Sequence, residues 1–311
     1  MNRISVVTSL LLATAVFAAP NDPESTKTVS LIKPTYADVP YGPHERNKLD
    51  FWQAEGDGPR PVVFFIHGGG FRKGDKSVTK GLENMKEDYL DKGISCCSIN
   101  YRYTSQALLP ASMQDAARAL QFVRSKAMEW SVDKNRIALT GSSAGACSSL
   151  WLALHDDMAD PGSDDPVLRE STKPTCAAVI NGQTSLDPEW IEKNIGAVAS
   201  NYPMLAEAFG AANSEEIVKS RDKYEKIVVE CSPMSHLDKG DPPIYFLYLY
   251  GPTLPPKDRA HGIHHPVFGN KFKEKADEAG LECHVNVKND KSKYGSLEGF
   301  VRAKLLDSPA Q

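Results

Sequence analysis

Residues 136 to 146 read Arg136-Ile-Ala-Leu-Thr-Gly-Ser-Ser-Ala-Gly-Ala146 and predict a sharp turn. A short apolar run comes first, and the residues that follow, up to His155, carry apolar side chains at helical spacing. Glycines at Gly141 and Gly145 let the backbone pass abruptly from a strand into a helix, because side chains there would collide. The pattern G-x-S-x-G therefore predicts that Ser143 stands exposed at the apex of the turn.

A second glycine-rich turn lies upstream, where the buried strand Pro61-Val-Val-Phe-Phe-Ile66 ends in His67-Gly-Gly-Gly70. Backbone N–H groups can face a developing oxyanion only where no Cβ atom crowds the substrate, and each such donor lowers the barrier by ~3 to 4 kcal/mol. Two matching turns in this order predict a nucleophile, Ser143, facing an oxyanion hole. The predicted donors are Gly68, Gly69 and Ala144.

Composition indicates one catalytic domain. The chain has 311 residues, of which 41% are hydrophobic and 24% charged, and its formal net charge is −4. This negative net charge does not favour nucleic-acid binding, which usually requires a basic surface. Residues 1–18 combine an early Arg3 with an apolar core and small residues before Pro20, which predicts a cleaved secretory signal. We expect residues 19–311 to form a single domain that is secreted or periplasmic, without stable membrane insertion.

The cysteines and acidic residues predict no metal site. The six cysteines leave disulfide connectivity open, and four of them lie in apolar stretches where packing is the expected role; these four are Cys96, Cys97, Cys147 and Cys176. No spacing suggests zinc. The acidic segment 155–174 matches no EF-hand loop and is read as a solvated loop. We expect neither a metal nor another cofactor.

Apolar runs alternate with helical patterns along the chain, which predicts a mostly parallel sheet covered by helices on both faces. Two short strands are expected within 36–52. Helices are expected over about 78–92, 110–129, 144–155, 266–279 and 296–306, and further strands over 94–101, 176–183, 243–250 and 282–288. A turn is expected at 133–136. The stretch 187–231 reads as a helical cap insertion, with a possible apolar lid; the lid residues would be Trp190, Ile191, Met204, Leu205 and Phe209.

The chain resembles secreted bacterial esterases of the α/β-hydrolase fold, in particular the hormone-sensitive-lipase-like and the feruloyl- or acetyl-esterase-like branches. The motifs that carry the resemblance are Tyr101-Arg-Tyr103, the helix with Asp115, Asp133-Lys-Asn-Arg136, Ser232-Pro233 and the two glycine turns. The resemblance runs from about Tyr36 to the C-terminus. It implies a serine-type carboxylic ester hydrolase that forms an acyl-enzyme on a small ester, such as a carbohydrate-linked acetyl or feruloyl ester.

The C-terminal half of the family's triad is absent from its usual loops. The loop after strand 243–250 reads Gly251-Pro-Thr-Leu-Pro255, without aspartate, and the loop 289–295 contains no histidine. One hypothesis is that the base has moved to the loop 252–265, where His261, His264 and His265 cluster and the last two immediately precede a helix. The acids that could then orient it are Asp258, in the same loop, and Asp187. An alternative role for Asp187 is to cap a cap-insertion helix beginning at Pro188.

A second hypothesis leaves the protein without a base. It would then be a catalytically impaired member of the fold that binds a small ligand, with Ser143 as a polar contact. For any single histidine of the 252–265 loop, a helix cap or loop hydrogen bond is the ordinary role. His155, at a helix end, and His236, in the loop that starts at Ser232, are read as structural. The sequence leaves the oligomeric state open.

Overall fold

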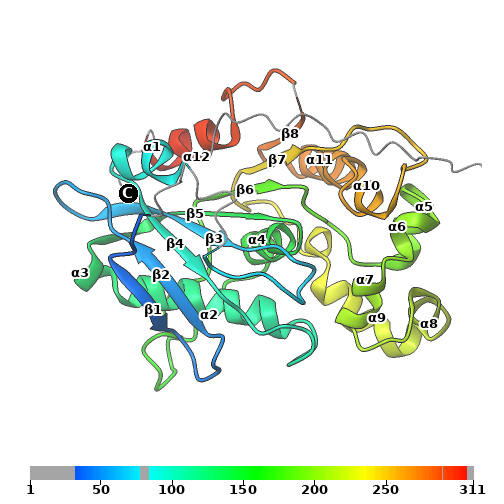
Figure 1. Cartoon of the computed structure of the whole chain (residues 1–311), viewed down its shortest axis with the longest axis horizontal. Coiled ribbons are helices and arrows are strands. Elements are labelled where there is room, and N and C mark those ends of the chain that lie inside the picture. Colours follow the sequence, from blue (N-terminus) through cyan, green and yellow to red (C-terminus); the bar gives the residue numbers. More distant parts are fainter. Residues whose placement is uncertain (1–31, 78–83, 289, 307–311) are drawn as a thin grey trace, which may run out of the picture. The chain divides into compact units, whose positions relative to one another are not determined.

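An eight-stranded sheet runs through the described part of the chain, which in this computed structural model comprises residues 32–77, 84–288 and 290–306 (Figure 1). The strands are β1 (Tyr36–Pro40), β2 (Lys48–Trp52), β3 (Arg60–Ile66), β4 (Ser95–Ile99), β5 (Val132–Ser142), β6 (Cys176–Ile180), β7 (Ile244–Tyr248) and β8 (Cys283–Val287). Their spatial order is β1-β2-β4-β3-β5-β6-β7-β8. Only the pairs β1–β2 and β2–β4 are antiparallel. The mostly parallel sheet predicted from the sequence is therefore confirmed.

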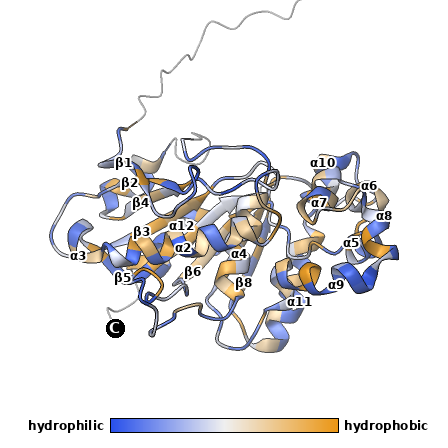
Figure 2. Cartoon of the chain, turned by 90° about the horizontal axis from the view of Figure 1, so that it is seen from below, coloured by the Kyte–Doolittle hydropathy of each residue, from blue (hydrophilic) through white to orange (hydrophobic). Residues whose placement is uncertain are grey.

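Alternate residues of the strands face two separate apolar layers. In β3, Phe64 packs in the layer that includes helices α2 (Ala111–Ser125) and α4 (Ala144–Leu154), whereas Val63 packs in the layer of α12 (Leu297–Leu306). Side chains of a strand alternate between faces, so one apolar run supplies both layers. Figure 2 shows this apolar character concentrated in the central strands. Helices cover both faces of the sheet, as expected.

Three of the predicted elements differ from the structure by more than the position of their ends. The helix expected over 110–129 is divided into α2 and a short α3 (Ala127–Trp130). The turn expected at 133–136 lies inside β5, where the register with β3 shifts between Arg60 and Val62 and leaves the extra residues unpaired. Of the helix expected over 78–92, residues 78–83 lie outside the described part; the rest forms α1 (Met85–Asp88) and the 3-10 turn η1 (Leu90–Lys92), ending at Gly93 with φ +73°.

The cap segment 187–231 is helical. It contains α5 (Pro188–Asn194), α6 (Ala197–Ser200), α7 (Pro203–Ala208), α8 (Ser214–Lys219) and α9 (Arg221–Cys231), and it is followed by the 3-10 turn η2 (Pro233–Ser235). After β7 come α10 (Arg259–Ile263) and α11 (Val267–Ala279). Figure 1 shows α5 to α10 grouped beyond one end of the sheet. This is the end at which the parallel strands finish and the predicted site residues follow them.

Two sequence predictions concern the cysteines and the membrane. All six cysteines are free and buried, in agreement with the packing role predicted for four of them. In the described residues no helix is long and apolar enough to cross a membrane. The predicted export signal, residues 1–18, lies outside the described residues.

Candidate active site

The turn at Ser143 has the strained backbone that the glycine pattern predicts. Ser143 has φ +54° and ψ −120°, a region that costs a non-glycine residue ~1 to 3 kcal/mol. Two backbone hydrogen bonds hold it there: its N–H donates to Ile180 over 3.0 Å, and its carbonyl accepts from Cys147 over 2.9 Å. The hydroxyl is thereby carried at the junction of β5 and α4. A side chain held in a strained turn by the surrounding fold is typical of functional sites.

Glycine is required on both sides of Ser143 by close backbone contacts. A Cβ atom on Gly145 would lie 2.0 Å from the Ile66 carbonyl oxygen, and one on Gly141 would lie 2.6 Å from the same atom. Both distances are far inside van der Waals contact, so the turn can approach the end of β3 only without side chains. This contact brings the serine turn and the loop after β3 together.

The loop that follows β3 is fixed by hydrogen bonds from neighbouring elements. Buried His67 stacks on Tyr101 with ring centroids 4.3 Å apart, and the Tyr101 hydroxyl donates to the His67 carbonyl over 2.8 Å. Burial lowers the pKa of His67 to about 4, an effect that a hydrogen bond with the Gly68 carbonyl opposes only in part. His67 is therefore neutral near pH 7. Its role in this structure is to hold the glycine loop.

Gly68 lies directly beside the serine. A Cβ atom built on Gly68 would lie 3.5 Å from the Cβ atom of Ser143 and 2.6 Å from the Ser142 carbonyl oxygen. Gly69 has φ +108°, which a side chain would rarely adopt. Ala144 is the first residue of α4, where the backbone N–H groups have no acceptor within the helix. The three predicted oxyanion donors thus lie in the two turns that meet at Ser143.

The loop after β7 brings a histidine to the serine. The Nε2 atom of His264 lies 2.8 Å from the Ser143 hydroxyl oxygen, which is hydrogen-bonding distance. His264 follows the last residue of α10 and is half-buried. This pair joins residues 121 positions apart in the chain. Of the two histidines proposed as the base, the structure brings His264 to Ser143.

The His264 ring is half-buried, and no charged side chain of the described residues contacts it. Burial lowers its pKa below the usual value of 6.5, and the Ala260 carbonyl acts in the opposite direction. The Nδ1 atom is buried and has no hydrogen-bond partner among the described residues. The lowered pKa keeps the imidazole neutral near pH 7, which is the protonation state that a general base needs.

His265 does not occupy the position of a base. It is fully buried, its Nε2 atom lies 3.3 Å from the Thr253 carbonyl oxygen, and its Nδ1 atom accepts a hydrogen bond from the Val267 N–H over 3.2 Å. His261 is held in the same way, between the Lys257 N–H and the Gly251 carbonyl. Because backbone groups occupy both nitrogens of each ring, these two histidines organise the loop.

Neither predicted acid contacts the base. Asp258 caps the start of α10, where its carboxylate accepts from the His261 N–H over 2.8 Å. Asp187 caps α5 by accepting from the Glu189 N–H over 3.0 Å, and it also forms a bidentate ion pair with Arg221. The prediction that one of them orients the histidine is therefore corrected. The alternative role given to Asp187, a helix cap next to Pro188, is confirmed.

Two residues that sequence reasoning missed support His264. The Tyr250 ring stacks on His264 at 5.5 Å and on His261 at 5.8 Å. Gln183 donates to the Ile263 carbonyl over 2.7 Å and so fixes the residue before His264. An aromatic residue at the end of a strand and a buried glutamine after the neighbouring strand gave no distinctive signal in the sequence. Their role depends on how the loop after β7 folds over the end of the sheet.

A pocket opens beside Ser143 and is bounded by the cap. Its empty space is about 430 Å³, counting the part open to solvent. The lining residues include Ser143, Ala144 and Gln183 from the sheet side and Tyr202, Met204, Leu205 and Ala208 from the cap. Of the predicted lid residues, Met204 and Leu205 line this pocket. Trp190 stacks on Phe268 of α11, and Ile191 and Phe209 are buried in the core.

The sheet order, the strained serine turn and the covering helices define the class of this protein as an α/β hydrolase. Solved structures with the same fold include a truncated carbohydrate esterase from gut microbiota, with a TM-score of 0.61 and 20% identity, covering 81% of this chain and 86% of that one. Another is an acetyl ester-xyloside bifunctional hydrolase from Caldicellulosiruptor lactoaceticus, with a TM-score of 0.59 and 20% identity, covering 85% and 82%. The BD-FAE family model matches residues 49–249, which is more than half of the chain. The protein belongs to the BD-FAE family.

Curated relatives match parts of the chain. The probable carboxylic ester hydrolase LipM of Mycobacterium tuberculosis is 28% identical over 234 residues, which is 73% of this chain and 50% of that protein. Esterase LipQ of the same organism is 32% identical over 132 residues, 40% of this chain and 31% of that protein. The chain thus spans half or less of the length of these relatives. The matches agree with the hydrolase class that the fold defines.

Proposed function

We propose that this protein is a serine-type carboxylic ester hydrolase in which Ser143 is the nucleophile and His264 is the general base. The single observation that carries the proposal is the 2.8 Å contact between the Ser143 hydroxyl oxygen and His264 Nε2. A serine hydroxyl is a poor nucleophile at neutral pH unless an adjacent base accepts its proton. The relatives named carboxylic ester hydrolase or esterase support the same reaction class.

In the proposed reaction, Ser143 Oγ attacks the ester carbonyl carbon while His264 Nε2 takes the hydroxyl proton. The negative charge that develops on the carbonyl oxygen faces the backbone N–H groups of Gly68, Gly69 and Ala144. When the tetrahedral intermediate collapses, the bond to the alcohol oxygen breaks and His264 returns the proton to that oxygen. Water, activated by the same imidazole, then hydrolyses the acyl-enzyme and frees Ser143.

Among the described residues no carboxylate contacts His264, and this limits the rate that we expect. In a full triad an aspartate fixes the histidine tautomer and stabilises the imidazolium, and its replacement by asparagine lowers kcat by ~10⁴-fold. Here the stacked Tyr250 ring holds the imidazole, and no described residue places a negative charge beside it to stabilise its protonated form. We therefore expect turnover of activated esters, at rates below those of complete triads.

The substrate that we propose is a small ester, with carbohydrate-linked acetyl or feruloyl esters as the substrate class to test first. Support comes from the modest pocket beside Ser143 and from the two structural neighbours whose names specify a carbohydrate esterase and an acetyl ester hydrolase. Because the cap residues that line the pocket are largely apolar, we expect them to contact the acyl group.

A catalytically impaired ligand-binding protein is the second candidate. The observation in its favour is the buried Nδ1 atom of His264, which no carboxylate contacts in the described part of the chain.

Turnover of p-nitrophenyl acetate separates the two candidates. Ser143→Ala should abolish turnover above the background of the buffer, whereas the neighbouring Ser142→Ala should retain it. Equal rates in the wild type and Ser143→Ala would remove the hydrolase proposal and leave the binding protein.

A further inference from the structure

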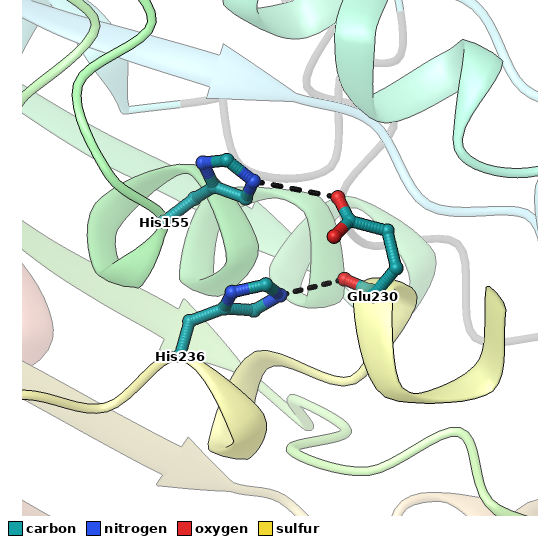
Figure 3. Close-up of side chains that lie close together, drawn as sticks. All are labelled: His155, Glu230 and His236. Atoms are coloured by element: carbon teal, nitrogen blue, oxygen red, sulfur yellow. Dashed lines mark hydrogen bonds and ion pairs between the residues drawn. The ribbon is translucent and has the colours of Figure 1, made fainter. Parts of the chain in front are cut away.

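Three potential metal ligands meet at the opposite end of the serine-bearing helix. His155 follows α4, Glu230 lies near the end of α9, and His236 follows η2 (Figure 3). One ligand atom from each residue lies within 4.8 Å of those of the other two. Because α4 has 11 residues, this cluster is ~16 Å along the helix from Ser143. It is therefore separate from the ester site.

The hydrogen bond of His155 turns its second ring nitrogen towards Glu230. Its Nδ1 atom lies 3.0 Å from the Asp156 carbonyl oxygen, which can only accept, so Nδ1 carries a proton. In the neutral ring, Nε2 then presents a lone pair, and it faces the Glu230 carboxylate oxygen 3.4 Å away. A ring nitrogen and a carboxylate oxygen that face each other can both bind one metal ion.

The surroundings match those of a metal-bound histidine. Such a histidine commonly donates its other ring N–H to a carbonyl, as His155 does to Asp156. The Nε2 atom of His236 lies 2.7 Å from the main-chain carbonyl oxygen of Glu230, which also accepts from Trp151 over 2.8 Å. This contact leaves Nδ1 of His236 as its lone-pair nitrogen. Trp151 also packs on the His155 ring, with centroids 4.6 Å apart.

The cluster can close on an ion by small side-chain movements. Zn²⁺ holds nitrogen and carboxylate ligands at ~2.0 to 2.2 Å, so two of its ligands lie at most ~4 Å apart. The present spread of up to 4.8 Å exceeds this by about an ångström. The Glu230 side chain is 36% exposed and that of His155 is 22% exposed, so both have room to rotate.

We propose that His155, Glu230 and His236 bind a divalent transition-metal ion of the Zn²⁺ type. Two imidazoles and one carboxylate suit Zn²⁺, whereas Mg²⁺ and Ca²⁺ prefer oxygen ligands alone. The bound ion would join the end of α4 to the last cap helix and to the turn that follows it. Its role is to fix the cap, and it takes no part in ester chemistry. This site could not be predicted from the sequence, because its ligands lie on three separate segments.

Calorimetric titration of the full, chelator-treated chain with Zn²⁺ tests this proposal. The wild type should bind one equivalent saturably, and its melting temperature should rise when Zn²⁺ is added. Loss of a supporting partner alone weakens metal affinity by ~10- to 100-fold, so His155→Ala and His236→Ala should each weaken it at least as much. Glu230→Gln should also weaken binding while keeping the main-chain contacts to Trp151 and His236. This variant covers the case in which a histidine variant fails to fold.

His284→Ala is the matched control. His284 Nε2 lies 3.0 Å from the Glu282 carboxylate but belongs to no group of three such ligands among the described residues, so its loss should leave binding unchanged. Ser143→Ala should also bind normally, which separates this proposal from the proposed esterase activity. Absence of saturable binding in the wild type, or equal affinity in wild type, His155→Ala and Glu230→Gln, would overturn the metal site and leave a direct contact between His155 and Glu230.

Discussion

The two halves of the candidate active site are built by different means. The serine turn and the loop after β3 are determined by the backbone: glycines at 68, 141 and 145 allow contacts that no side chain would permit. The loop after β7, which supplies His264, is held by side chains, through the rings of Tyr250 and His261 and the amide of Gln183. A backbone constraint can be recognised in the sequence because it requires glycine, whereas a side-chain arrangement requires no particular sequence pattern.

Replacement of the two adjacent histidines of the loop after β7 should produce the largest effect, because only His264 contacts Ser143. General base catalysis contributes ~10²- to 10⁴-fold, so we expect His264→Ala to lower kcat for p-nitrophenyl acetate by ~10³-fold or more. His265→Ala removes a fully buried side chain together with its hydrogen bonds to Thr253 and Val267, and should instead lower stability by ~1 to 3 kcal/mol. Rates are to be compared at a temperature where urea titration shows both variants folded. A greater loss of kcat in His265→Ala would reverse the assignment.

Glycine replacement tests the difference in backbone constraint directly. Gly145→Ala places a Cβ atom 2.0 Å from the Ile66 carbonyl oxygen. Overpacking of a side chain costs ~1 to 3 kcal/mol and a backbone clash should reach the top of that range, with loss of activity. Gly251→Ala, in the histidine loop, meets no atom within 4 Å and should change stability by less than ~0.5 kcal/mol. The free energy of unfolding in urea measures both, and equal losses would contradict the account.

The sequence predicted the first half of the site and left the second half open. The positions of the glycines predict the strand, turn and helix around Ser143. They also predict that this turn contacts the 67–70 loop. The sequence could not show which of the three histidines within 261–265 is the base. Two of them form hydrogen bonds with the carbonyls of Gly251 and Thr253, and these contacts depend on how the loop folds. Asp187 was proposed as an acid because it follows a strand, but its carboxylate pairs with Arg221, a residue 34 positions away.

Tyr250 should act as a positioning residue for the base. Its removal in Tyr250→Ala frees the His264 ring, and aromatic contacts of this kind are worth ~0.5 to 1.5 kcal/mol, so we expect kcat to fall by up to ~10-fold. KM should change little, because Tyr250 is not among the residues that line the pocket. Tyr250→Phe, which keeps the ring, should restore the rate. A rise in KM at constant kcat would instead place Tyr250 in substrate binding.

The pH profile of kcat/KM should show the smallest effect. The base must be neutral, so activity is present above the pKa of His264 and is lost as the pH falls through it. Burial lowers that pKa, so the acid limb should have its midpoint below 6.5. A triad carboxylate near the ring would raise it. An acid limb with a midpoint clearly above 6.5 would reveal a negative charge near His264 that this account does not contain.

The rate at which a fluorophosphonate probe modifies Ser143 tests the central claim most directly, because it reports the reactivity of that oxygen without the need for turnover. Peptide mass spectrometry should locate the adduct on Ser143 in the wild type. The rate of labelling should fall by ~10²-fold or more in His264→Ala and remain close to that of the wild type in the folded His265→Ala variant. No adduct in the wild type, or an equal labelling rate in His264→Ala, would contradict the proposed activation of Ser143 by His264.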